Sequence, residues 1–174
     1  MEAVYTMKSY ALKLEEAKSL ADIFELVKEG VRTVMKTGRA GLTLGLAELG
    51  GGENYWVGAF YPVGSNTIIM NKVPLRRIAE TDPGLYNAYA FHVLLHEYLH
   101  SLGYIDERGA RNLVVWISHE LFGEDHVVTQ MAKNITRFLP NLTYPIPGYF
   151  QKKLEELEVE MVKDFDRSSV NYIN

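Results

Sequence analysis

Apolar residues first recur at helical spacing over residues 20–36, as on the buried face of an amphipathic helix. These positions are Leu20, Ile23, Phe24, Val27, Val31, Val34 and Met35. Ser19 followed by Asp22 resembles a capping box at the start of the segment, and Thr37-Gly38 is typical of a helix end. We therefore predict a helix over residues 20–36.

The next region has the pattern of β-strands. Leu42, Leu44 and Leu46 alternate with other residues, as on a half-buried strand. Two further β-favouring segments follow at 55–61 and 67–71, and the residues between the three segments have the composition of turns. Three short strands joined by turns predict an antiparallel meander.

From residue 82 onward the pattern is helical. Asp82-Pro83 is typical of a helix start, with Asp at the N-cap and Pro at the first helical position. An apolar-rich run continues to Leu102, where Gly103 is typical of a helix end. The sequence therefore predicts one long helix from residue 82 to Leu102.

The remaining chain adds further helices. Asp106 is a candidate N-cap for a second helix, which Gly123 ends, and a third helix is expected over 125–138. A Pro-rich connector at 140–147 precedes a charged tail, predicted to be helical over 149–165. A helix, a small sheet and then several helices predict an α+β fold.

Composition indicates one globular domain over residues 1–174, in which about 140–174 form a connector and a C-terminal appendage. Hydrophobic residues make up 47% of the chain and charged residues 23%, and the formal net charge of -4 does not favour nucleic acid as a partner. No apolar run approaches the roughly 20 residues of a membrane span. The N-terminus lacks the apolar block of a signal peptide, so we expect a cytoplasmic protein that binds neither nucleic acid nor membranes.

One short segment, His96-Glu97-Tyr98-Leu99-His100, carries candidate metal chemistry. The chain has no Cys, so a metal site must use His and carboxylate ligands. On a helix, residues four apart share one face, so His96 and His100 can bind one tetrahedral Zn²⁺. Glu97 lies about 100° further round, where its carboxylate can reach a metal-bound water without ligating the metal. The segment predicts one zinc ion per chain, with Glu97 as general base.

This segment resembles the zincins, the zinc metallopeptidases built on His-Glu-x-x-His. Together with the residues as far as Asp106, it fits the longer pattern His-Glu-x-x-His-x-x-Gly-x-x-His/Asp of the metzincin clan. The resemblance implies that Gly103 turns the chain sharply after the helix and that Asp106 is the third zinc ligand. It also implies a compact zincin-like fold, similar in size to small archaeal zincins. In that fold the edge strand of a small antiparallel or mixed sheet packs on the motif helix.

The third ligand has alternatives. An Asp just before a helix is a common N-cap, which gives Asp106 a second possible role. In gluzincin-type zincins a Glu on a following helix completes the site, and Glu120 lies at about that distance from His100. A straight helix from residue 107 would carry Glu120 roughly 20 Å along its axis. His126, at the start of the third predicted helix, is a chemically suitable ligand as well.

Further residues gain candidate roles. In zincins an edge strand aligns the substrate peptide, and the candidate strand is Thr67, Ile68, Ile69, Met70 and Asn71, unless it lies inside the sheet. Metzincins place a Met in a tight turn beneath the metal. Met131 is the nearest candidate downstream, but its helical pattern favours a core role. Tyr104 is a candidate oxyanion donor, and His92, too far round the helix to share the ion, is expected to pack or to support the ligands.

Together these features predict a zinc metallopeptidase, a hydrolase acting on peptides or proteins. Zinc would activate a water for attack on the scissile carbonyl, and Glu97 would accept its proton. Two alternatives share the site: a zinc hydrolase of non-peptide amides or esters, and a non-enzymatic binding or regulatory module with a closed zinc site. Residues 140–150 are a candidate for blocking the cleft, with a plain surface connector as the alternative.

Overall fold

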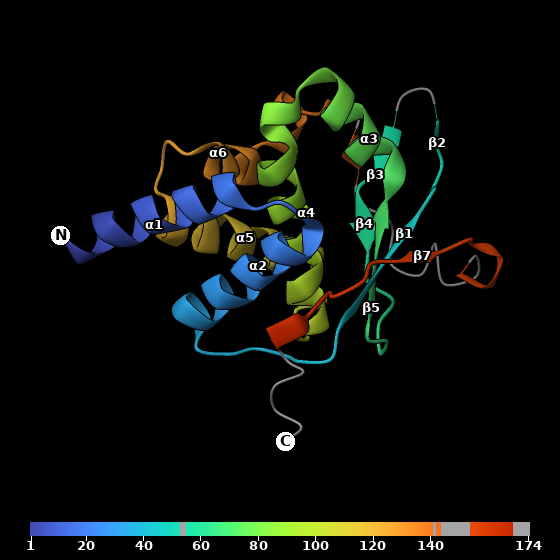
Figure 1. Ribbon diagram of the computed structural model, residues 1–174, viewed down its shortest axis with the longest axis horizontal. Coiled ribbons are helices and arrows are strands. Elements are labelled where there is room, and N and C mark those ends of the chain that lie inside the picture. The colour runs from blue at the N-terminus through green and yellow to red at the C-terminus, as the bar shows by residue number, and fades with distance from the viewer. Residues whose placement is uncertain (53–54, 141, 144–153, 169–174) are drawn as a thin grey trace.

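The computed structural model describes residues 1–52, 55–140, 142–143 and 154–168, and this part of the chain has the predicted α+β class (Figure 1). Most of the helices gather on one side of the molecule and the strands on the other. The helices are α1 (Glu2–Glu16), α2 (Leu20–Met35), α3 (Lys72–Thr81), α4 (Tyr86–Ser101), α5 (Glu107–Phe122) and α6 (Val127–Lys133). Among these helices none is long and apolar enough to cross a bilayer.

Helix α4 lies at the centre of the fold. It contacts α2, α5, α6 and the strand β4 (Ala59–Phe60), and every residue from Ala88 to Ser101 is buried. A helix that is apolar around most of its circumference is stable only when neighbours cover all its faces. The few polar side chains on α4 are therefore held rigidly and away from bulk water.

The main sheet has the strand order β4-β5-β1-β7 in the described part of the chain, with β1 at Thr43–Ala47, β5 at Thr67–Asn71 and β7 at Glu160–Met161. Strands β1 and β5 pair in parallel, and Leu44 lies opposite Ile68. The predicted antiparallel meander is therefore wrong. Strand β5 returns between β4 and β1, because its continuous apolar run is buried and requires neighbours on both sides.

A second, smaller sheet adjoins the first. Strand β3 (Tyr55–Val57) pairs antiparallel with β2 (Gly51–Gly52) and parallel with β6 (Leu142–Thr143). Strand β3 precedes β4 by one residue, so the chain passes from one sheet into the other. Of the segment 140–150, considered above as a block of the cleft, residues 141 and 144–150 lie outside the described residues.

The predicted helix over 20–36 is confirmed as α2. The Ser19 hydroxyl accepts a hydrogen bond from the backbone N–H of Asp22 (3.1 Å), and the Asp22 carboxylate accepts one from the N–H of Lys18 (2.9 Å). The long helix predicted from residue 82 begins later. Pro83 starts a short 3₁₀ helix (Pro83–Leu85), and α4 follows it.

The later helices agree in part with the sequence. Helix α5 has Asp106 as its N-cap and ends at Gly123, as predicted. The third predicted helix is shorter than expected, because α6 ends at Lys133 and a 3₁₀ turn (Ile135–Arg137) follows. Helices α1 and α3 were not predicted. In α1 the buried residues are Tyr10 and Leu14, which leaves a weak apolar pattern.

The described part of the C-terminal tail is not the predicted helix. It forms a 3₁₀ turn (Leu154–Glu156), the strand β7 and further turns, and residues 149–153 of that prediction lie outside the described residues. The tail returns to α2, where the Phe165 ring stacks on Phe24 with centroids 4.1 Å apart.

A buried ion pair fastens the tail. Lys28 on α2 pairs with the Asp166 carboxylate, and its Nζ lies 2.9 Å from the Glu25 carboxylate and 2.7 Å from the Ser168 hydroxyl. Asp166 also accepts a hydrogen bond from the N–H of Leu42 (2.8 Å), just before β1. We refer to Lys28, Glu25, Asp166 and Ser168 as the C-terminal clamp.

Candidate metal centre

Helix α4 presents two imidazoles to each other across one helical turn. The Nε2 atoms of His96 and His100 are 3.0 Å apart, and the two rings stand nearly perpendicular, at 88°. Both side chains are buried. The spacing of four residues therefore produces the juxtaposition that the sequence predicted.

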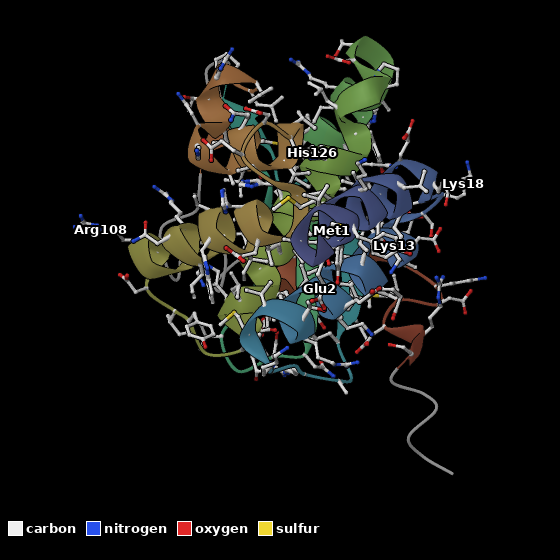
Figure 2. All side chains as sticks on the ribbon, turned by 90° about the vertical axis from the view of Figure 1, so that its left-hand side faces the viewer. Met1, Glu2, Lys13, Lys18, Arg108 and His126 are labelled. Atoms are coloured by element: carbon white, nitrogen blue, oxygen red, sulfur yellow. The ribbon has the colours of Figure 1, made fainter. Side chains whose placement is uncertain are left out.

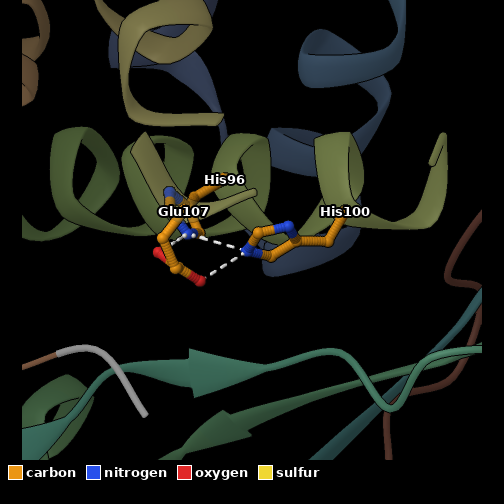
Figure 3. Close-up of side chains that lie close together, drawn as sticks. All are labelled: His96, His100 and Glu107. Atoms are coloured by element: carbon orange, nitrogen blue, oxygen red, sulfur yellow. Dashed lines mark hydrogen bonds and ion pairs between the residues drawn. The ribbon is translucent and has the colours of Figure 1, made fainter. Parts of the chain in front are cut away.

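The third group comes from the first residue of α5. One carboxylate oxygen of Glu107 lies 2.9 Å from His100 Nε2, and the other lies 3.2 Å from His96 Nε2 (Figure 3). The candidate ligand atoms of these three residues all lie within 4.8 Å of one another. Gly103, with a φ of 102°, allows the turn between α4 and α5 that brings Glu107 back over the imidazoles.

The structure places Asp106, the expected third ligand, in a different role. Its carboxylate accepts a hydrogen bond from the backbone N–H of Gly109 (2.6 Å) and caps α5, and it is not part of the three-residue group. Glu107, one position further on, was missed by the sequence analysis. A signal existed, since a second carboxylate follows Asp106 directly after the Gly turn.

The two alternative ligands lie elsewhere. The Glu120 side chain is half exposed and lies 3.7 Å from His119. His126 is the N-cap of α6, where its Nδ1 accepts from the N–H of Val128 (3.2 Å) and its ring stacks on Phe122. Neither residue belongs to the group that His96, His100 and Glu107 form.

A backbone carbonyl orients His100. The Nδ1 of His100 is 2.7 Å from the carbonyl oxygen of Tyr104, so Nδ1–H donates to it and Nε2 faces Glu107. Such a partner fixes the ring orientation and leaves the other nitrogen available as a ligand. The Tyr104 side chain, considered above as an oxyanion donor, is 39% exposed. Its carbonyl is the part that contacts the site.

The charges of the group depend on one another. Burial raises the pKa of Glu107, but the hydrogen bonds and charges of His100 and His96 outweigh it and bring that pKa well below its usual range. Burial lowers the pKa of His100, and the hydrogen bond to Glu107 together with the charge of Glu97 raises it overall. The site thus holds a carboxylate that stays ionised beside two imidazoles, a donor set suited to a cation.

Glu97, the predicted general base, is buried beside the group. Burial raises the pKa of its carboxyl, against the opposing charges of His96 and His100 and a backbone hydrogen bond from Tyr61. Tyr61 directly follows strand β4, so the Glu97 carboxylate faces the end of that strand. Burial thus favours the protonated form of the Glu97 carboxyl more than water does.

Two further residues take the packing roles that the sequence favoured. His92 is buried on α4 one turn before His96, and burial lowers its pKa to about 3. Met131 is fully buried on α6 within the main core. His92 lies outside the three-residue group, in keeping with its drift around the helix.

The prediction that residues 67–71 form a substrate-aligning edge strand is wrong. Strand β5 lies between β4 and β1 and pairs with both, so an added peptide strand has no position beside it. The prediction failed because β5 follows a turn and resembles an edge strand in isolation. In the described part of the chain, β4 is the edge strand on this side of the sheet.

The donor set fits zinc. Two imidazole nitrogens and one carboxylate oxygen are the ligands of many catalytic zinc sites, in which the fourth position stays open. Magnesium and calcium prefer sites made of oxygen ligands alone. Comparison of the chain with protein-family models, curated proteins and solved structures finds no significant match. The resemblance to zincins therefore rests on the motif residues and their geometry.

Proposed function

We propose that this protein is a zinc-dependent metallopeptidase with a zincin-like fold. The observation that carries the proposal is the convergence of His96, His100 and Glu107 beside a buried Glu97. Three ligands and an adjacent carboxyl that can accept a proton are the parts that metal-assisted hydrolysis requires. Neither the clan-typical Asp106 ligand nor the Met-turn is part of the proposal.

His96, His100 and Glu107 would hold the zinc ion. When bound, zinc supplies a water of lowered pKa and an electrostatic partner for the oxygen of the scissile carbonyl. The carbonyl of Tyr104 keeps His100 in its ligating orientation. The two helices α4 and α5 meet at this point, so the ligands lie on rigid elements rather than on a long loop.

Glu97 would move the protons of the reaction. It accepts a proton from the attacking water and passes it to the nitrogen of the leaving amine. Burial raises the pKa of its carboxyl, which makes the carboxylate a stronger base than a Glu in water. In this proposal, strand β4 replaces β5 as the element beside which a peptide substrate lies extended.

The test compares the wild type with Glu97→Gln after purification in zinc. We expect about one zinc per chain in both proteins, measured by mass spectrometry, and cleavage of a peptide library by the wild type alone. Removing a general base slows hydrolysis by about 10²–10⁴-fold. Glu120→Gln, a half-exposed Glu outside the group, is the matched control and should retain full activity.

The outcomes separate the alternatives. Zinc in both proteins with no peptide cleavage, but with hydrolysis of simple esters or amides, would favour the non-peptide hydrolase. Zinc without any turnover would favour a binding or regulatory module. A wild type that takes up no zinc, or equal activity in Glu97→Gln, would contradict the metallopeptidase proposal.

A further inference from the structure

A small cavity of about 170 Å³ opens beside the candidate metal centre. It lies between α4, α5 and the segment that joins α6 to the following 3₁₀ turn. His96 belongs to both the metal-binding group and the wall of this cavity. The polar and charged residues that line it are His92, His96, Arg111, Lys133, Asn134 and Thr136. The cavity therefore adjoins the metal-binding group at His96.

The permanent charges at this cavity are positive. Among its described lining residues, Arg111 and Lys133 are the Arg and Lys side chains, and none is Asp or Glu. Two acidic residues near the cavity, Glu107 and Glu124, already interact with other side chains. Glu107 belongs to the metal-binding group, and its carboxylate lies 3.9 Å from Arg111 Nε. Glu124 pairs with Lys133 in an exposed ion pair of the kind that water weakens.

Metal binding would increase this positive character. A divalent ion carries two positive charges, and Glu107 contributes one negative charge to it, so Arg111 then faces a net cationic centre. An anionic group in the cavity would interact favourably with the metal and with both side chains. Asn134 and Thr136 can supply uncharged hydrogen-bond donors at the same wall.

The volume limits what can enter. A cavity of about 170 Å³ has room for a small polar group together with water. A short chain that ends in a carboxylate can enter such a space. The size of the cavity therefore admits the group that its charged side chains favour.

We propose that this cavity binds a carboxylate of the substrate, next to the scissile bond, through Arg111 and Lys133. The inference rests on the proposed metallopeptidase function and defines its substrate class. The carboxylate belongs either to an acidic side chain or to the C-terminus of a short peptide. Both sources place the same chemical group in the cavity.

The first experiment measures binding rather than turnover. Zinc-loaded protein is titrated in a calorimeter with succinic acid monohydroxamate and with the analogue in which an amide replaces the carboxylate. The hydroxamate end of both compounds chelates zinc. The difference in affinity between them therefore measures how the cavity interacts with the carboxylate. We expect the carboxylate compound to bind about tenfold more tightly, the size of one charge-assisted hydrogen bond at a partly exposed site.

Variants assign the preference to residues. Arg111→Gln and Lys133→Gln should each reduce the tenfold preference to about threefold, and the affinity for the amide analogue should change little. Arg108→Gln is the matched control, because Arg108 lies on the same helix, is exposed and points away from the body of the molecule (Figure 2). It should retain the full preference.

A second experiment distinguishes the sources of the carboxylate. Blocked peptides with Glu or Gln after the scissile bond are compared with the Gln peptide that has a free C-terminus. About tenfold faster cleavage of the blocked Glu peptide identifies an acidic side chain, and about tenfold faster cleavage of the free-acid peptide identifies a terminal carboxylate. Either result supports the inference.

The failures are distinguishable. If the protein takes up zinc but binds the two hydroxamates with equal affinity, the cavity proposal is wrong and the metallopeptidase proposal stands. A preference that survives in both Arg111→Gln and Lys133→Gln would also overturn it. If the wild type takes up no zinc, both proposals fall together.

Discussion

Two groups of buried ionisable side chains in the described part of the chain, the C-terminal clamp and the candidate metal centre, are built in opposite ways. In the C-terminal clamp the cation and its counter-charges are all supplied by the chain, since Lys28 contacts two carboxylates and a hydroxyl. At the candidate metal centre the chain supplies lone-pair donors, two imidazole nitrogens and a carboxylate, directed at one small region.

The contrast separates a cluster that contains its own cation from one that could receive a cation. The clamp already contains its cation, Lys28, and it holds the tail against α2. A group of converging donors such as His96, His100 and Glu107 could hold a metal ion. The same contrast gives each region its own set of expected responses to mutation.

The largest effect is expected from breaking the clamp. Asp166→Ala leaves Lys28 buried with part of its counter-charge missing, and loss of one partner of a buried ion pair costs about 3–5 kcal/mol. Urea unfolding should show this decrease in the free energy of unfolding, toward the lower end because Glu25 remains. Zinc binding should be unchanged under conditions in which the variant is folded.

The matched control is Arg167→Ala, which removes the neighbouring exposed ion pair with Asp22. Exposed pairs contribute about 0–1 kcal/mol. Equal destabilisation by Asp166→Ala and Arg167→Ala would show that burial does not distinguish the clamp from an ordinary surface pair.

The next effect concerns the metal centre. Glu107→Gln keeps the shape of the side chain but removes the negative charge, so zinc affinity should fall by about 100-fold or more. Competition with a chromophoric chelator measures this affinity. The stability of the zinc-free protein should change far less than in Asp166→Ala. Unchanged zinc affinity in Glu107→Gln would exclude Glu107 as a ligand.

A third response depends on pH. Burial lowers the pKa of His92 to about 3 in the folded chain, against about 6.5 when unfolded. The unfolded state therefore binds the extra proton first. The contribution of His92 to the free energy of unfolding is fully present above pH 6.5. It decreases as the pH falls toward 3, by up to about 1.4 kcal/mol per pH unit. In zinc-free His92→Gln this part of the slope should vanish, so parallel pH profiles for variant and wild type would contradict it.

The smallest effect separates two adjacent carboxylates. Asp106→Ala removes the N-cap of α5 and should cost about 1 kcal/mol in urea unfolding. Its zinc affinity should match that of the wild type, in contrast to Glu107→Gln. Loss of zinc from a folded Asp106→Ala would return Asp106 to the role that the metzincin pattern gives it.

Local patterns in the sequence predicted the parts of the fold that local physics decides. The helix α2, its cap at Ser19 and the end of α5 at Gly123 each follow from neighbouring residues. The pairing of His96 with His100 follows from the helical period alone. These features need no knowledge of the rest of the chain.

The features that were missed depend on distant parts of the chain. The position of β5 between β4 and β1 is set by three-dimensional packing, which an isolated apolar segment does not reveal. The choice between Asp106 and Glu107 turns on a rotation of about 100° at the start of α5. One residue caps the helix and the next one reaches the imidazoles.

The position of the clamp residues along the chain also determines when they are synthesised relative to the metal-centre residues. Its partners Lys28 and Asp166 are separated by 138 positions along the chain, whereas the candidate metal centre is complete once Glu107 has been made. At about 5–20 residues per second of synthesis, the ribosome adds Asp166 several seconds after Glu107. A nascent chain therefore has its zinc ligands before the means to fasten its tail.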